Sequence, residues 1–167
     1  LDALVHFMAT IERAPNRFRA PEGLTLTQRR GKAVFERTML NSGARLEPEQ
    51  RCNHCHRGAY RTNRQKTAVA TTMWFDAAVE ADLTDLFNAD EYGELGSYYF
   101  MDAGMPSQAF DVPHLIDVAG GPPFLHNGAA ATLEEVWTKF NMVNRHGATD
   151  DLTREQFNDL VAYLKAQ

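Results

Sequence analysis

The chain has 167 residues, a formal net charge of −5 and an apolar content of 44%. This length and apolar content predict one globular domain, or one domain with short appendages. The acidic balance and the scattered Lys and Arg argue against nucleic acid as a partner, and no apolar run approaches the ~20 residues needed to span a bilayer. The densest basic stretch, residues 57–66, is more typical of a solvated surface than of a docking patch for an acidic redox partner.

The chain opens with a helical pattern. Apolar residues stand at positions 1, 4, 5, 7, 8 and 11, which is helical spacing, and Pro15 sets the limit of this helix. Residues 13–24 contain Pro15, Pro21 and Gly23, which predict an extended linker. We interpret residues 1–24 as a helix and linker from a preceding domain, and residues 25–167 as the domain that carries the function.

A second helix is predicted from residue 25 to about residue 39. It opens with the capping box Thr25-Leu-Thr-Gln28, and its buried side would hold Gly31, Val34, Phe35 and Met39. A glycine inside a helix costs about 1 kcal/mol relative to alanine. We therefore expect a packing reason for Gly31, the alternative being an incidental glycine.

The most informative stretch is Cys52-Asn-His-Cys55-His56, which reads C-x-x-C-H. Two thiols at this spacing, at the start of a helix, can each add to one vinyl group of a single porphyrin, and His56 can then bind the iron. The chain has only these two cysteines. A redox C-x-x-C motif would favour a βαβ context, and a zinc site would need a second Cys or His pair; neither pattern is visible.

The motif therefore predicts one covalently bound haem c, with iron as its metal. Because haem is attached to c-type proteins outside the cytoplasm, a periplasmic or cell-surface location in a bacterium is expected. Residues 57–110 have little pattern apart from a possible helix near residues 83–87. A stretch of this length without regular structure is unusual in a compact domain, but it suits a chain that wraps a cofactor.

Two further capping boxes predict the last helices. Thr132-Leu-Glu-Glu135 would open a helix to about residue 140, and Thr153-Arg-Glu-Gln156 a terminal helix with Phe157, Leu160 and Leu164 facing inward. An alternating strand pattern is almost absent. The predicted class is all-α: a cytochrome c-like helical domain wrapped around one covalently bound haem, with long irregular loops.

The helix with Gly31 and Phe35, the motif after it and a terminal helix with Tyr163 resemble the cytochrome c fold. In that fold the first and last helices cross, and a small residue lets their backbones approach beside an aromatic ring. The resemblance implies that Gly31 lies at such a crossing.

Several stretches in the second half are similar to the C-terminal haem domain of bacterial dihaem cytochrome c peroxidases and their MauG-like and rubber-oxygenase-like relatives. They are residues 110–119, Pro122-Pro-Phe-Leu-His-Asn-Gly128, Thr132–Val136 and Leu160–Leu164. This resemblance implies an electron-transfer domain that works with a second, catalytic haem domain. It matches poorly over residues 60–109.

The ligand opposite His56 decides the chemistry of the iron. A thioether raises the potential relative to a second imidazole, and an open site permits reaction with peroxide or oxygen. His146, in Arg145-His-Gly147, is the first candidate, since relatives of this family carry a His-Gly at this place. Met142 and Met105 are the alternative distal ligands. For each residue alone, an ordinary structural role is also open.

Two functions follow from these alternatives. A six-coordinate haem would make the chain an electron-transfer module that serves a redox partner protein or a second haem domain. An open iron would make it a haem enzyme, a peroxidase or oxygenase, which needs a nearby acid–base group. Glu134 and Glu135 are better explained by helix capping and the helix dipole, and we therefore assign no catalytic residue and favour electron transfer.

Overall fold

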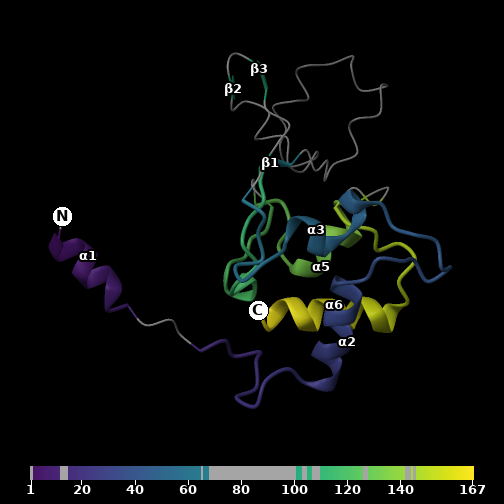
Figure 1. Ribbon diagram of the computed structural model, residues 1–167, viewed down its shortest axis with the longest axis horizontal. Helices are drawn as coiled ribbons and strands as arrows, with labels where there is room; N and C mark the ends of the chain where they lie inside the picture. The colour runs from purple at the N-terminus through teal and green to yellow at the C-terminus, as the bar shows by residue number, and fades with distance from the viewer. Residues whose placement is uncertain are drawn as a thin grey trace.

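The computed structural model describes residues 2–11, 15–64, 66–67, 101–102, 105–106, 110–125, 128–141, 144 and 146–167. Its described α-helices are α1 (Asp2–Ala9), α2 (Leu26–Phe35), α3 (Cys52–Cys55), α5 (Leu133–Thr138) and α6 (Arg154–Lys165), and two short 3₁₀ helices are η1 (Pro48–Gln50) and η6 (Val118–Gly120). Figure 1 shows α2, α3 and α5 gathered around α6. The described part of the chain is thus helical, in agreement with the predicted class.

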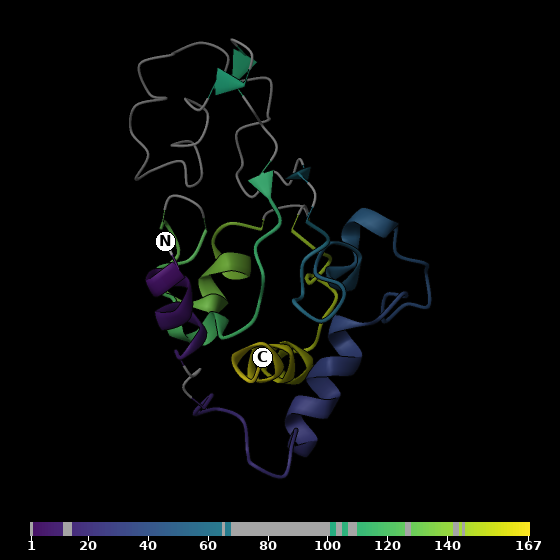
Figure 2. The same ribbon diagram turned by 60° about the vertical axis from the view of Figure 1, so that its left-hand side comes forward.

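The centre of the fold is the crossing of α2 and α6, which lie side by side in Figures 1 and 2. An ideal Cβ at Gly31 would lie 1.8 Å from the backbone oxygen of Asp159, so only glycine allows this approach. Beside it the rings of Phe35 and Tyr163 pack with their centroids 5.4 Å apart. The packing reason expected for Gly31 is therefore present.

An ion pair between the buried Asp159 and the partly exposed Arg30 stabilises the same crossing. Asp159 is only 4% exposed, and Arg30 donates to its two carboxylate oxygens at 2.6 and 3.0 Å. A buried carboxylate is costly without such a partner, and a two-point guanidinium contact also fixes the relative orientation of the helices. The core around the crossing adds Leu133, Leu160 and Leu164.

The predicted capping boxes at both crossing helices are present. Thr25 accepts a hydrogen bond from the backbone N–H of Gln28, whose side chain caps Thr25 in return, and Thr153 and Gln156 repeat the arrangement. At α5 the Thr132 side chain accepts from the N–H of Glu135. Each contact pairs N–H groups that the first turn of a helix leaves without an intrahelical partner.

One prediction about α2 is wrong. The helix ends at Phe35, so Met39 does not continue its buried face, and the Met39 side chain is 58% exposed. Met39 instead forms a β-bridge with Arg45 in the loop that follows. The helical pattern could not show this, because the apolar side chain of Met39 happens to fall in phase with Phe35.

The described strands are two residues long. Strand β1 (Lys66–Thr67) pairs antiparallel with β4 (Phe110–Asp111), and β2 (Met101–Asp102) pairs antiparallel with β3 (Met105–Pro106). These pairs are too short to form a sheet that could hold a core face. The expected helix near residues 83–87 lies outside the described residues.

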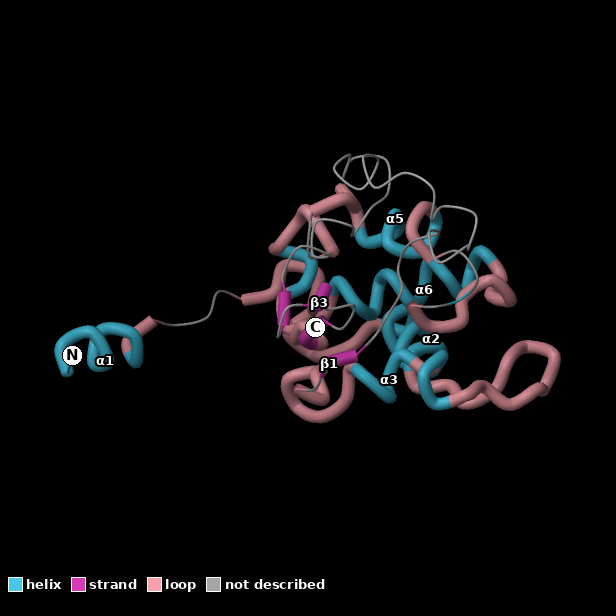
Figure 3. Tube along the Cα trace, turned by 90° about the horizontal axis from the view of Figure 1, so that it is seen from above, coloured by secondary structure: helices cyan, strands magenta, loops and turns pink. Residues whose placement is uncertain are grey.

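Helix α1 contrasts with the rest of the fold. Its apolar side chains Leu4, Val5, Phe7 and Met8 are 56–63% exposed, and none of its residues is buried. Figure 3 shows α1 away from the other helices. None of the helices in the described ranges is long and apolar enough to cross a membrane.

Candidate functional site

The C-x-x-C-H motif forms the short helix α3 and the residue after it. The helix follows η1, and the N–H of His56 donates to the carbonyl of Cys52 at 2.9 Å, which closes the turn. Cys52 and Cys55 are half-buried and are not joined in a disulfide, whereas His56 is only 8% exposed. The motif thus presents two thiols and a buried imidazole from one turn of helix.

The orientation of the His56 ring is fixed by two backbone carbonyls near its Nδ1 atom. Its Nδ1 lies 3.2 Å from the carbonyl oxygen of Arg61 and 3.2 Å from that of Pro113. Both partners are acceptors, so Nδ1 carries the ring proton and donates it. The other nitrogen, Nε2, therefore keeps its lone pair, which is the arrangement that second-shell carbonyls impose on a metal-binding histidine.

Arg61 links this ring to the helix crossing. Its backbone has φ +55°, a left-handed value that is uncommon for a non-glycine residue, and its guanidinium donates to the hydroxyl of Tyr163 and to the side chain of Gln167. The same guanidinium lies 5.5 Å from the centroid of the Phe35 ring. The carbonyl that faces His56 is thus anchored to α6 and α2.

His146 lies opposite the motif histidine. The centroids of the His56 and His146 rings are 6.3 Å apart, and the ring planes differ by 30°. The indole N–H of Trp137 donates to the carbonyl of His146 at 3.1 Å, and its ring centroid is also 6.3 Å from that of His146. The fold therefore brings together two histidines that are 90 positions apart in the sequence.

The loop that carries His146 packs directly on the motif. Gly147 has φ +78°, and an ideal Cβ there would lie 3.3 Å from the sulfur of Cys52. The next residue, Ala148, donates its N–H to the carbonyl of Gln50 at 2.9 Å. Glycine is favoured at position 147 both by the backbone conformation and by the limited space beside the sulfur.

Burial sets the protonation of the site. It lowers the pKa of His56 to about 4, with a further contribution from the nearby His146, and it raises the pKa of the Cys52 thiol to about 11. At neutral pH His56 is therefore neutral, which is the form that binds a metal.

These residues fit a covalently attached haem iron. Two metal–nitrogen bonds of about 2 Å each, together with the distance from nitrogen to ring centre on either side, add up to about 6 Å between ring centroids. The two rings meet this spacing. Two thiols one helical turn apart supply the groups that a porphyrin needs for attachment, and no charged partner competes with His56 for its nitrogen among the contacts described above.

The other sequence candidates divide into two groups. Met142 lies outside the described residues, and of Met105 only the backbone in β3 is described. The histidines at positions 6, 54 and 114 are exposed. Of the ligand candidates, the described part of the chain thus brings His146 to His56.

Sequence reasoning missed the residues that hold the two histidines. The carbonyls of Arg61 and Pro113 and the side chain of Asn141 carry no signal in a motif, because backbone groups are common to all residues. An Asn directly after the predicted end of a helix is an ordinary turn residue. For Asn141 the only available sign was its place five residues before His146.

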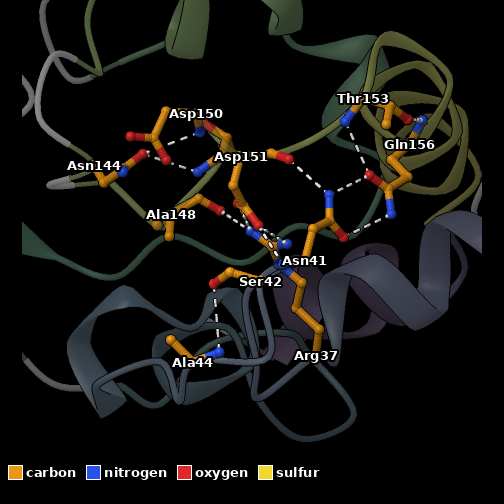
Figure 4. Close-up of polar contacts among 12 residues, drawn as sticks. Arg37, Asn41, Ser42, Ala44, Asn144, Ala148, Asp150, Asp151, Thr153 and Gln156 are labelled. Carbon is orange, nitrogen blue, oxygen red and sulfur yellow. Dashed lines mark hydrogen bonds and ion pairs between the residues drawn. The ribbon is translucent and has the colours of Figure 1, made fainter.

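A polar cluster closes the far side of the His146 loop (Figure 4). Arg37 donates to the carboxylate of Asp151 at two points, one of them 3.0 Å long, and to the carbonyl of Ala148 at 2.8 Å. Asn41 donates its N–H to Asp151 at 2.7 Å and exchanges two side-chain hydrogen bonds with Gln156. This cluster ties the end of α2 to the start of α6 and to the loop after His146.

No family model matches the sequence. The chain is 29% identical over 182 aligned positions to hydrazine synthase subunit gamma of Kuenenia stuttgartiensis, and the match covers 99% of this chain and 48% of that protein. A solved structure of Kuenenia stuttgartiensis hydrazine synthase pressurized with xenon matches with a TM-score of 0.64 and 25% identity, over 99% of this chain and 54% of the matched chain. The chain thus spans about half the length of these relatives.

The expected resemblance to the C-terminal domain of dihaem cytochrome c peroxidases and MauG-like proteins is therefore wrong. The stretches that carried it include a β-bridge between Phe124 and Ala130, the cap at Thr132 and the packed face of α6. Such features fix local geometry and helix packing, and they do not distinguish one activity from another. Over nearly its whole length, the chain is similar in sequence to hydrazine synthase subunit gamma and in structure to a chain of hydrazine synthase.

Proposed function

We propose that the chain binds one haem c through Cys52 and Cys55, with His56 and His146 as the two axial ligands, and that it transfers electrons within a larger enzyme. The main support for this proposal is the distance of 6.3 Å between the centroids of the His56 and His146 rings. His56 belongs to the motif, and His146 lies on a loop that packs against Cys52. With both axial positions taken by imidazole, the iron would have no open position for a substrate.

When bound, the haem supplies one-electron redox chemistry, which is the chemistry of the cofactor. The chain's own residues hold and shield it. Arg61 and Pro113 fix the His56 ring, and Trp137 fixes the carbonyl of His146. Two imidazole ligands favour a lower potential than an imidazole and a thioether would.

The comparisons support a proposal for the setting of this module. The matched relative is by name a subunit, and the chain covers about half of it. We propose that the chain likewise works beside partner proteins or a second haem domain, and that it does so outside the bacterial cytoplasm, where haem c is attached. In this proposal, residues 25–167 form the haem-binding unit. Residues 1–24 connect it to a neighbouring domain.

The test is to produce the chain in a bacterial periplasm with haem attachment machinery. The mass of the purified protein should exceed that of the polypeptide by one haem, and the oxidised protein should be low-spin without the long-wavelength band of methionine ligation. The bare polypeptide mass with reactive thiols would overturn the haem assignment.

The ligand itself is tested by His146→Ala. We expect the oxidised iron to become high-spin and to regain the low-spin spectrum when imidazole is added. His54→Ala is the matched control, because His54 lies in the same motif but is exposed, and it should leave the spectrum unchanged. An unchanged low-spin spectrum in His146→Ala would remove His146 as a ligand and would leave Met142 and Met105 as the candidates for the sixth position.

A further inference from the structure

We infer that Asn141 is the positioning residue of the His146 loop and that it keeps the sixth coordination position of the iron closed. This inference rests on the proposed function, because it assumes that His146 binds the iron. It adds that a single buried amide, distant from both cysteines in the sequence, determines how firmly that ligand is held.

The side chain of Asn141 contacts both His146 and Gly147. Its side-chain oxygen accepts the backbone N–H of His146 at 2.6 Å, and its side-chain nitrogen donates to the carbonyl of Gly147 at 2.8 Å. The same nitrogen lies 3.2 Å from the hydroxyl of Thr149. One amide thus contacts the residues on both sides of the peptide bond that joins His146 to Gly147.

The amide is buried, so these contacts are costly to lose. Asn141 is 8% exposed, and its hydrogen bond to Gly147 is wholly buried. A buried polar group that loses its partner pays its full desolvation cost, and water cannot easily replace the partner there. The loop can therefore move His146 away from His56 only if several buried groups lose their partners together.

The position of the amide explains why the loop faces the motif. By holding the carbonyl of Gly147, Asn141 constrains the left-handed turn at that residue, beside the sulfur of Cys52. By accepting the backbone N–H of His146, the Asn141 side chain also fixes the position of that peptide nitrogen. Trp137 adds a second restraint through the carbonyl of His146, from the helix that ends three residues before Asn141.

Only an amide can make this set of contacts. A carboxylate of the same shape can accept from His146, but it has no hydrogen to donate to Gly147 or Thr149. An aspartate would place its oxygen against the carbonyl oxygen of Gly147, and the two would repel. Asn141→Asp and Asn141→Ala therefore test the positioning role by two different routes.

The experiment uses the haem-loaded chain and measures the equilibrium affinity of the oxidised iron for cyanide, together with the high-spin fraction. Cyanide can bind only when the His146 loop has moved away, so its apparent affinity reports the population of the open state. We expect Asn141→Ala and Asn141→Asp to raise that affinity about tenfold or more, given the loss of two to three hydrogen bonds, one of them buried.

Asn144→Ala is the matched control. Asn144 lies in the same loop and accepts from the N–H groups of Thr149 and Asp150, and none of its described contacts is to His146 or Gly147. It should lower the melting temperature without a comparable change in cyanide affinity. If Asn141→Ala does not accumulate with haem, Asn141→Asp and Asn141→Ser decide the question, because they leave less empty space.

The outcomes separate the inference from the function on which it rests. An unchanged spectrum in His146→Ala would overturn the ligand assignment itself. A high-spin spectrum in His146→Ala, combined with wild-type cyanide affinity in the Asn141 variants, would overturn the role of Asn141 alone. Equal effects in the Asn144 and Asn141 variants would also overturn it, because they would show general loosening of the loop.

Discussion

Gly31 is the residue whose structural reason is simplest to test. The nearest atom to an added Cβ is the backbone oxygen of Asp159 at 1.8 Å, and the Cβ of Tyr163 follows at 2.8 Å. Backbone atoms cannot rotate away as a flexible side chain can. Any larger residue at this position must therefore push α2 and α6 apart.

We expect Gly31→Ala to lower the free energy of unfolding by about 3 kcal/mol, because overpacking outweighs the gain of about 1 kcal/mol in helix propensity. Urea or thermal unfolding measures this. Gly121→Ala is the control, since its added Cβ would meet no atom closer than 3.9 Å and its backbone conformation is open to other residues. A Gly31→Ala variant as stable as the wild type would contradict the described crossing.

At the scale of single residues, the sequence indicates candidates that lie within one short motif. It does not indicate residues that only the fold brings together. Cys52, Cys55 and His56 could be proposed as a haem site because the chemistry of haem attachment depends on spacing within one turn of helix, and this assignment stays a prediction. His146 could be suggested only by resemblance, since nothing in its own neighbourhood indicates that it lies 6.3 Å from His56. Asn141 could not be identified at all, because its role depends on backbone groups that the fold brings to it.

Among the elements, the polar cluster of Arg37, Asn41, Asp151 and Gln156 joins α2 to α6 at the end opposite the capped N-terminus of α2. The Arg37 guanidinium holds the pKa of Asp151 below its usual value, chiefly through their hydrogen bonds. The charged form of Asp151 is therefore favoured in the folded chain. It stabilises the fold above the unfolded pKa of about 4, and this contribution is lost as the pH falls through that value toward the folded pKa.

We expect Asp151→Asn to lower the free energy of unfolding by about 1 kcal/mol at pH 7, a modest value because both partners of the ion pair are partly exposed. The difference from the wild type should shrink as the pH falls below about 4, where the wild-type carboxylate is also neutralised. Urea titrations between pH 3 and pH 7 measure it. Asp150→Asn is the control on the neighbouring residue, and a difference that is independent of pH would contradict the ion pair.

The boundaries of the elements follow their caps more closely than their apolar patterns. Capping boxes at Thr25 and Thr153 placed the starts of α2 and α6 correctly, since a cap is a local arrangement of neighbouring residues. The end of α2 was placed too late, because Met39 continues the apolar spacing although the chain has already turned. Periodicity cannot distinguish a helix end from a loop residue that falls in phase.

For the whole molecule, the division at residue 24 stays a prediction, and three hydrogen bonds bear on it. Asn16 donates its side-chain N–H groups to the carbonyls of Lys165 and Gln167, and Gln28 donates to the carbonyl of Phe18 at 2.6 Å. Residues 16–18 are thus attached to α6 and α2, although they fall within the predicted linker. Helix α1 has no buried residue.

Removal of residues 1–11 should therefore leave the melting temperature within about 2 °C of the parent chain, because no buried surface is lost. Removal of residues 1–24 should lower it by about 5 °C, because the contacts of Asn16 and Phe18 are lost as well. Thermal unfolding of the haem-loaded chains compares the two. Equal melting temperatures would favour the division at residue 24.

The turn at Gly147 has a consequence for how the protein is made. This turn covers the sulfur of Cys52, with space for a hydrogen atom but hardly for a methyl group. In the proposed haem-bound protein, an attachment enzyme would have to reach that sulfur while it is still a thiol. The thioether bond to Cys52 would then form before Gly147 packs beside the sulfur.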